Sequence, residues 1–475
     1  MSTPEPPLTV RTVAGRREVA QVALALGCAL ALRLAYAHYI VGLPPTGDSY
    51  IAQLRGDVVG QDWVYGSPSR GIERFVATNQ PPLFTLLLAF VRQFTSSRLV
   101  TADLLAGLSA ATLGLVWWTA RREFGRAAGF VALLLGGTYA HLIIQGGLIM
   151  SEVLAQFLAA LLLLIGPVAI RRLDPLPVVA TGAVCGLMAL TRAELAVLSP
   201  IIALALLVAG VRRFGRAGVV RTLAAPATLA VTAALVYAPW INYTNQVLGR
   251  PVPSTGSGLY QLATSCETSL RGELVGYRDP ACFTKAYGDL RNPEKQDLRL
   301  NRTVNDLLWD ERAHEEAAAM IDDADVNMVY VRALRVARGL GIYRPFDTAQ
   351  LEAGERMQAP NWLANVQVVQ WFAVMALAAP GLIVARLRGM PLSPALGLGV
   401  AAVAAMALGF GLSRYRATFD PAAVLLASAG AVGLAEQFRS SRGRIGAEIS
   451  SRYPHLTRRR RPPERAGPHR EARSR

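Results

Sequence analysis

Asp48 is the residue whose type and position best suit a chemical role. It lies in the segment Thr46–Tyr50, a few residues beyond the first long apolar stretch of the chain. A carboxylate at the mouth of a membrane helix is costly and is usually functional. Such a carboxylate can accept the proton of an attacking hydroxyl, and nearby cations keep it ionised at neutral pH. The simpler alternative is a turn residue in Thr-Gly-Asp-Ser.

Three arginines flank later apolar stretches and could bind an anion. Arg192 closes one stretch, and Arg414 and Arg416 lie between two others. Guanidinium groups hold phosphate through charge-assisted and often bidentate hydrogen bonds. Contact with lipid headgroups, or snorkelling to the membrane surface, would also account for them.

Two further carboxylates are candidates for the same site. Glu152 opens an apolar stretch, and Glu194 follows Arg192 by two residues. Either could bind sugar hydroxyls, orient an acceptor or pair with Arg192. The alternatives are a local ion pair for Glu194 and a favourable helix-dipole position for Glu152.

The elements that must position these residues are membrane helices. The 475 residues are 52% hydrophobic and only 17% charged, whereas soluble domains are typically about 25% charged. Apolar runs of roughly 18 or more residues recur, each long enough to cross about 30 Å of hydrocarbon. We therefore expect an all-α, polytopic integral membrane protein. The first run lacks a small-residue cleavage site, so we expect a retained helix and not a signal peptide.

Hydropathy predicts ten spans and one shorter apolar helix. The spans are expected at residues 19–41, 99–120, 127–145, 150–170, 176–192, 195–211, 222–241, 364–386, 391–412 and 418–436. The segment 82–94 would be only about 20 Å long as a helix, so we expect it to lie in the membrane interface. A charged helical stretch is expected at 294–338.

Arginine sets the expected orientation, because arginine-rich short loops stay in the cytoplasm. Residues 436–475 hold twelve arginines and four glutamates, a surplus of eight within a formal net charge of +16. We assign this basic tail to the anionic cytoplasmic membrane surface in preference to nucleic acid. The predicted organisation is a cytoplasmic amino terminus (1–18), a transmembrane core (19–241) with a first outer loop (42–98), a large extracytoplasmic loop (242–363), carboxy-terminal spans (364–436) and a cytoplasmic tail (437–475). The Ala/Arg bias is typical of a bacterial plasma-membrane protein.

Two of the four cysteines, Cys266 and Cys282, share the large loop. If that loop faces an oxidising space, a disulfide is expected; the alternative is two unpaired thiols. Cys28 and Cys185 lie in apolar stretches and are expected to be inert packing residues. A zinc site is not expected, because His314 is the only histidine of the loop.

In order along the chain, these motifs resemble the GT-C superfamily of membrane glycosyltransferases, in particular its protein O-mannosyltransferase and aminoarabinose-transferase branch. That branch has an acidic residue in the first outer loop, a basic residue before Pro-Pro-Leu, an acidic residue opening the fourth helix, Leu-Thr-Lys/Arg ending a later helix and a late Arg-aromatic-Arg turn. The matching segments here are Gly47-Asp48-Ser49-Tyr50, Gln80-Pro81-Pro82-Leu83, Glu152, Leu190-Thr191-Arg192 and Arg414-Tyr415-Arg416. The resemblance is best over residues 20–200. Gln80 departs from the pattern, since its amide can hydrogen-bond a phosphate but cannot neutralise it.

The resemblance implies a sugar donor carried on polyprenyl phosphate and an active site on the outer face. Asp48 would deprotonate the acceptor hydroxyl, and attack at the anomeric carbon would invert its configuration. Substrate contacts would come from Tyr50, Gln80, Glu152, Arg192, Glu194, Arg414 and Arg416. The arginines would stabilise the departing lipid phosphate. The sequence requires no cofactor and predicts no metal ligands, although a divalent cation could take part, as in some relatives. The acceptor could be a protein, a lipid or a glycan.

Two other classes of function stay open at this stage. A transporter or flippase of a lipid-linked precursor predicts broken helices and charges within the spans. Arg33, inside the first span, fits that alternative. A non-enzymatic membrane scaffold would use the outer loop for binding and would keep its function when Asp48 is changed to Asn.

Overall fold

The computed structural model describes residues 15–44, 52–53, 56–57, 59–60, 80–215, 218–282, 284 and 302–452. Within these ranges every regular element is a helix. Asp48 and Tyr50 lie outside the described residues, so their predicted roles stay predictions. The all-α, polytopic fold expected from hydropathy is the fold that the structure has.

Long apolar helices form the body of the protein. Seven helices of the described residues are long and apolar enough to cross a membrane, or eight if one bent pair counts as a span. They include α1 (Arg16–Val41), α4 (Arg98–Phe124), α7 (Ser151–Arg172), α9 (Leu198–Phe214, preceded by the 3₁₀ helix η2, Ala193–Val197), α10 (Val219–Leu248), α17 (Asn361–Leu387) and α19 (Asp420–Arg452). Two further expected spans, α8 (Pro175–Thr191) and α18 (Ser393–Leu408), are apolar helices of 17 and 16 residues. Helix α3 (Leu83–Arg92) has 10 residues and is too short to span.

The bent pair replaces a single expected helix. Instead of one span at 127–145, the chain forms α5 (Arg126–Thr138) and α6 (Ala140–Gly147), which meet at 59°. A break inside a membrane frees backbone carbonyls that need donors. Arg33 of α1 supplies them: Nη2 donates to the Gly136 carbonyl at 3.1 Å and Nη1 to the Gly137 carbonyl at 3.4 Å. Arg33, whose charge inside a span fits a transporter, thus has a structural role at the helix break.

Helices α17 and α19 approach each other with little space between their backbones. A Cβ atom added at Gly381 would lie 1.9 Å from the Leu426 carbonyl oxygen, and one at Gly430 would lie 1.9 Å from that of Leu377. Only glycine permits this contact, as is common where membrane helices cross closely. The close contact holds the first third of α19, which follows directly on a turn described below.

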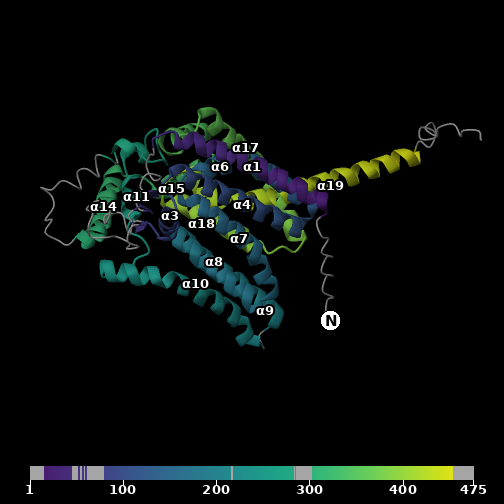
Figure 1. Cartoon of the computed structure of the whole chain (residues 1–475), viewed down its shortest axis with the longest axis horizontal. Helices are drawn as coiled ribbons and strands as arrows, with labels where there is room; N and C mark the ends of the chain where they lie inside the picture. The colour runs from purple at the N-terminus through teal and green to yellow at the C-terminus, as the bar shows by residue number, and fades with distance from the viewer. Residues whose placement is uncertain are drawn as a thin grey trace, which may run out of the picture.

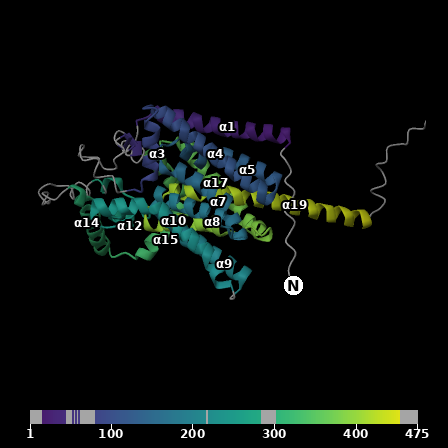
Figure 2. The ribbon, with the colours of Figure 1, turned by 60° about the horizontal axis from the view of Figure 1, so that its bottom comes forward.

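The large loop folds into short helices at one end of the bundle. They are α11 (Ser257–Leu262), α12 (Glu267–Leu270), α14 (Arg302–Ala324), α15 (Met328–Gly339), α16 (Pro345–Glu352) and the π-helical turn η5 (Ala353–Met357). The expected charged helix at 294–338 is therefore two helices, α14 and α15. Figures 1 and 2 show α14 at one end of the molecule, while α19 projects from the opposite end.

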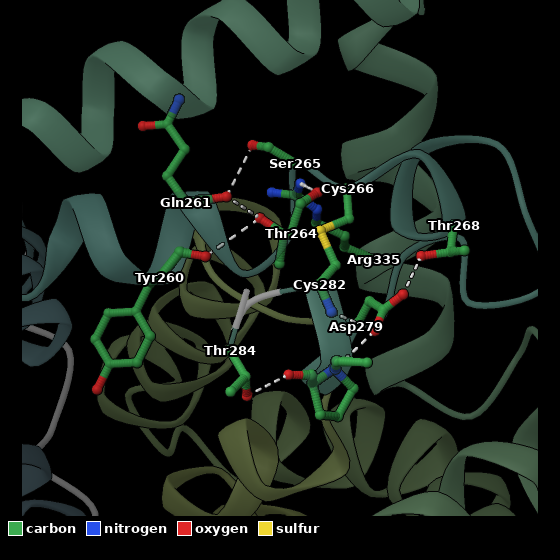
Figure 3. Close-up of a disulfide and its surroundings, with 12 residues drawn as sticks. Tyr260, Gln261, Thr264, Ser265, Cys266, Thr268, Asp279, Cys282, Thr284 and Arg335 are labelled. Atoms are coloured by element: carbon green, nitrogen blue, oxygen red, sulfur yellow. Dashed lines mark hydrogen bonds between the residues drawn. A yellow bond between two sulfur atoms is a disulfide. The ribbon is translucent and has the colours of Figure 1, made fainter. Parts of the chain in front are cut away.

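Cys266 and Cys282 form a disulfide within this loop domain, with 6.2 Å between their Cα atoms (Figure 3). Asp279 closes the same turn: it accepts from the Thr268 hydroxyl at 2.6 Å and from the backbone N–H groups of Ala281 and Cys282 at 2.9 and 3.0 Å. Burial raises the pKa of the Asp279 carboxyl, but these hydrogen bonds outweigh burial and hold the pKa below its ordinary value. The carboxylate and the disulfide together make the turn a rigid unit.

Candidate functional site

Three helix ends meet where the candidate residues lie. They are the amino end of α7, the junction of α8 with η2, and the 3₁₀ turn η6 (Ser413–Thr418), which precedes α19. The turn η6 contacts both α7 and α15. The apolar helix faces stop at these ends. Polar side chains can therefore gather there without interrupting the faces that pack in the membrane.

The ion cluster consists of Glu152, Arg192, Glu194 and Arg414. Nη1 of Arg192 donates to Glu152 Oε1 at 2.6 Å, and its Nε donates to Glu194 Oε1 at 2.5 Å. Nε of Arg414 lies 3.4 Å from the same Glu152 oxygen. Four of the residues predicted for the site are therefore brought together from three distant parts of the sequence.

The ion cluster is largely buried, and Glu194 is its most exposed member. The side chains of Glu152 and Arg414 are 1% and 5% exposed, whereas that of Glu194 is 28% exposed. Two carboxylates balance two guanidinium groups, which allows the charges to be buried.

Tyr415 is a member of the site that the sequence predictions did not assign. Its ring lies 5.3 Å from the guanidinium carbon of Arg192 and 5.6 Å from that of Arg414. Such cation–π contacts hold guanidinium groups in place without using their hydrogen-bond donors. The aromatic residue between two arginines in the sequence was the signal for this role.

Arg416 points away from the ion cluster. Its guanidinium carbon lies 4.3 Å from the centre of the Trp371 ring, and its Nη1 donates to the Gly339 carbonyl at 3.5 Å. A 3₁₀ helix has three residues per turn, so residues two apart project in different directions. Arg414 and Arg416 consequently contact different parts of the protein, although the sequence predicted a shared role for them.

Gln80 is connected to the ion cluster indirectly, by a row of aromatic rings. Its Nε2 donates to the Tyr260 hydroxyl at 3.4 Å. The Tyr260 ring lies 5.3 Å from that of Phe410, which lies 6.3 Å from that of Tyr415. The amide that departs from the family motif therefore contacts the loop domain, and the row leads from it to the ion cluster.

A second buried polar group, which the sequence predictions did not identify, lies beside η6. His141 Nδ1 and Asp420 Oδ2 are 2.5 Å apart, and neither side chain is exposed. The Tyr139 hydroxyl donates to the other Asp420 oxygen at 3.4 Å. An aspartate inside an expected span was the available signal, because such residues are rare and usually partnered. The pair joins the break between α5 and α6 to the start of α19.

Metal ligands do not gather in the part of the chain that the structure describes: no three His, Cys, Asp or Glu side chains are placed there to hold a metal ion. The residues around Asp48 lie outside the described part of the chain, and this finding does not extend to them. The ion cluster can supply charge stabilisation and hydrogen bonding.

Comparisons with solved structures identify the fold. The chain is similar to the oligosaccharyltransferase of Archaeoglobus fulgidus in its apo form, with a TM-score of 0.51, 13% sequence identity and coverage of 90% of this chain and 52% of that one. It also matches that enzyme, AglB, in complex with an inhibitory peptide and a dolichol-phosphate (TM-score 0.49, 15% identity, 91% and 52% coverage). A third match is ArnT from Cupriavidus metallidurans bound to undecaprenyl phosphate (TM-score 0.40, 15% identity, 91% and 80% coverage). The chain spans about half the length of the oligosaccharyltransferase.

These neighbours are GT-C superfamily membrane glycosyltransferases, the superfamily that the sequence motifs resemble. No protein-family model and no curated protein matches the chain. At such low identity the likeness establishes the fold and leaves the activity to be argued from the site.

Proposed function

We propose that the protein is a membrane glycosyltransferase that moves a sugar from a polyprenyl-phosphate donor to an acceptor hydroxyl on the outer membrane face. The ion cluster is the observation that carries this proposal. It holds two arginines, one from a helix junction and one from a turn that contacts the loop-domain helix α15, beside carboxylates. The GT-C fold supports the same class of reaction.

The proposed reaction forms one bond and breaks another at the anomeric carbon. Asp48 takes the proton of the acceptor hydroxyl, the hydroxyl oxygen attacks the anomeric carbon, and the bond to the lipid phosphate breaks with inversion. The phosphate gains charge as it leaves, and fixed guanidinium groups stabilise it most effectively in a site that excludes water. Arg192 and Arg414 fit this task because both are largely buried and held by Glu152 and Tyr415.

The carboxylates then have a second role. The ion cluster is balanced in charge, and its carboxylates already accept hydrogen bonds from the guanidinium groups. A lipid phosphate can accept from these guanidinium groups only when the carboxylates give up some of those hydrogen bonds. Glu194, the more exposed of the two, is the one that we expect to turn toward a sugar hydroxyl. Glu152 stays in place and orients both arginines.

The surroundings of the ion cluster define the remaining parts of the proposal. The short apolar helix α3 contacts α8 and would wall a groove for the prenyl chain. The disulfide-bonded loop domain would cover the site and select the acceptor. We place this domain outside a bacterial plasma membrane and both chain termini in the cytoplasm.

A transporter of a lipid-linked precursor is the second candidate function. The bent pair α5 and α6 and the buried pair His141–Asp420 favour it, since transporters often use broken helices and buried charges. It differs from the first candidate in one decisive respect: a transporter moves the whole lipid-linked sugar and cleaves no glycosidic bond.

The test is transfer from labelled polyprenyl-phosphate sugars in membranes that contain the wild type or Asp48→Asn. Loss of a general base typically slows a reaction by about 10²- to 10⁴-fold, so we expect a decrease in that range. Asp57→Asn is the matched control, because Asp57 lies in the same loop and pairs with Arg92. Equal transfer by wild type and Asp48→Asn would exclude the mechanism. Movement of intact donor across the bilayer without transfer would favour the transporter.

A further inference from the structure

The segment Glu352–Gln358, here named the strap, joins the loop domain to the candidate site. It runs from the end of α16 through the π-helical turn η5 to Gln358, whose backbone is left-handed with φ of +48°. Single π-helical turns are rare and are frequent at functional sites. The contacts of the strap, rather than its backbone alone, indicate what it does.

Glu352 holds the turn η6 directly. One carboxylate oxygen accepts from the backbone N–H of Ser413 at 2.5 Å, and the other accepts from the Ser413 hydroxyl at 2.6 Å. Glu352 is 1% exposed. A buried carboxylate with two donors from one residue is a strong and directional attachment. Ser413 immediately precedes Arg414, so this attachment fixes the residue that enters the ion cluster.

The other end of the strap holds the exit of α1. The Tyr36 hydroxyl donates to the Met357 carbonyl at 2.7 Å, and Gln358 Nε2 donates to the Pro44 carbonyl at 3.0 Å. Pro44 is the last described residue before the segment that contains Asp48. The strap therefore contacts the exit of α1 as well as the turn that carries Arg414.

The strap also packs on the start of α7. Met357 belongs to one buried apolar cluster with Tyr36, Ile144 and Met150. Met150 precedes the first turn of α7, which contains Glu152. On its outer side, Glu355 accepts from Arg278 Nη2 at 2.6 Å, which anchors the strap to the disulfide-bonded part of the loop domain.

We propose that the strap positions Arg414 within the ion cluster, with Glu352 as a positioning residue that acts through Ser413 on Arg414. This inference rests on the proposed function. Glycosyl transfer needs base and leaving-group stabiliser on opposite sides of one carbon atom, and a displacement of about 1 Å can cost 10²-fold in rate. A segment that bonds to the turn carrying Arg414 is suited to prevent such a displacement of the guanidinium group.

The test compares Glu352→Ala with Glu352→Gln in the full chain. Alanine removes both bonds to Ser413. Glutamine keeps them, because its carbonyl oxygen can accept from the N–H and its amide can donate to the hydroxyl. Glu311→Ala is the control, since Glu311 forms a half-exposed pair with Arg250 elsewhere in the loop domain, and such pairs contribute little. If Glu352→Ala does not fold, Ser413→Ala removes the hydroxyl bond alone and gives a smaller change in the same direction.

Two readouts separate positioning from general stability. Hydrogen exchange at residues 413–418 should rise about tenfold or more in Glu352→Ala and stay near wild type in Glu352→Gln. With labelled polyprenyl-phosphate sugars, kcat should fall about tenfold or more in Glu352→Ala while the KM for the donor changes less, and Glu352→Gln should restore it. If Glu352→Ala matches Glu311→Ala in exchange and in kcat, the strap has no positioning role.

Hydrogen exchange also distinguishes a failure of this inference from a failure of the proposed function. If the wild type transfers no sugar, the proposed function fails, and the strap is judged by exchange and by the affinity for undecaprenyl phosphate alone. Faster exchange and weaker binding in Glu352→Ala would then still support a strap that positions Arg414. Unchanged exchange and binding would reject it.

Discussion

One carboxylate oxygen of Glu152 serves two guanidinium groups, so this side chain determines how the arginines of the ion cluster are held. We predict that Glu152→Gln lowers kcat for sugar transfer by about tenfold or more without raising the KM for the polyprenyl donor. The amide can no longer attract two cations, so the arginines lose their orientation, while the added net positive charge favours binding of the phosphate. Steady-state kinetics with labelled donor measures both constants.

The control is Glu123→Gln at the opposite end of the bundle. Glu123 also pairs with an arginine, accepting from Arg171 Nη2 at 2.6 Å, and its side chain is 5% exposed. It should change thermal stability but leave kcat within about twofold of wild type. A rise in donor KM with unchanged kcat in Glu152→Gln would show that Glu152 contributes to binding and not to orientation of the transition state.

At the residue scale the sequence indicated some of the side chains that meet, but not how they pair. Glu152, Arg192, Glu194 and Arg414 lie together, since each stands at an end of an apolar stretch, whereas Arg416 lies over Trp371. The separation of Arg414 from Arg416 was not predictable, since it depends on a 3₁₀ turn that hydropathy does not reveal. The pairing of His141 with Asp420 depends on a helix break and a long-range contact, and neither has a local sequence pattern.

Among the elements, α1 and the bent pair α5 and α6 depend on each other through Arg33. This fully buried side chain also donates to the Ser109 hydroxyl at 2.9 Å and to the Ala29 carbonyl at 2.9 Å. We predict that Arg33→Leu lowers the free energy of unfolding by about 2–4 kcal/mol, because the carbonyls at the break lose their donors. Denaturant unfolding of purified protein in detergent measures this change.

Ser109→Ala is the comparison for that measurement. It removes only one of the four partners of Arg33 and should cost about 1 kcal/mol. Arg33→Lys should fall between the two, since a lysine ammonium can serve some of the carbonyls but lacks the fork of donors. Equal stability of wild type and Arg33→Leu would mean that the break is held by Gln370 alone, which bonds Ala140 and Thr138 across it.

The helices themselves were largely predictable from hydropathy. The expected span at 364–386 corresponds to α17 at Asn361–Leu387, and that at 99–120 to α4 at Arg98–Phe124. The last helix runs on to Arg452, well past the end of the apolar stretch at 436. The break at Tyr139 escaped prediction, since the segment on both sides of it is apolar enough on average to be read as one span.

The whole molecule is asymmetric along its long axis. The loop domain with its disulfide lies at one end, and α19 projects from the other (Figure 1). Arginines near that second end bind carbonyls at helix ends: Arg388 donates to Phe124, Arg213 to Arg172 and Arg171 to Gly389. Cations at helix carboxyl ends interact favourably with the helix dipole, so arginines that were predicted to orient the protein in the membrane also stabilise this end.

This asymmetry predicts which thiols are accessible from each side of the membrane. In a chain carrying Cys28→Ser and Cys185→Ser, a membrane-impermeant thiol reagent should label Glu311→Cys in intact cells, since that position is half-exposed in the loop domain. It should label Arg172→Cys, an exposed position at the arginine-rich end, only after the membrane is permeabilised. Mass spectrometry of the labelled peptides reads out both sites and the Cys266–Cys282 bond. Labelling of Arg172→Cys in intact cells would show that the topology is the reverse of the proposed one. The ion cluster would then lie on the cytoplasmic face, where a donor delivered from the outer leaflet could not reach it.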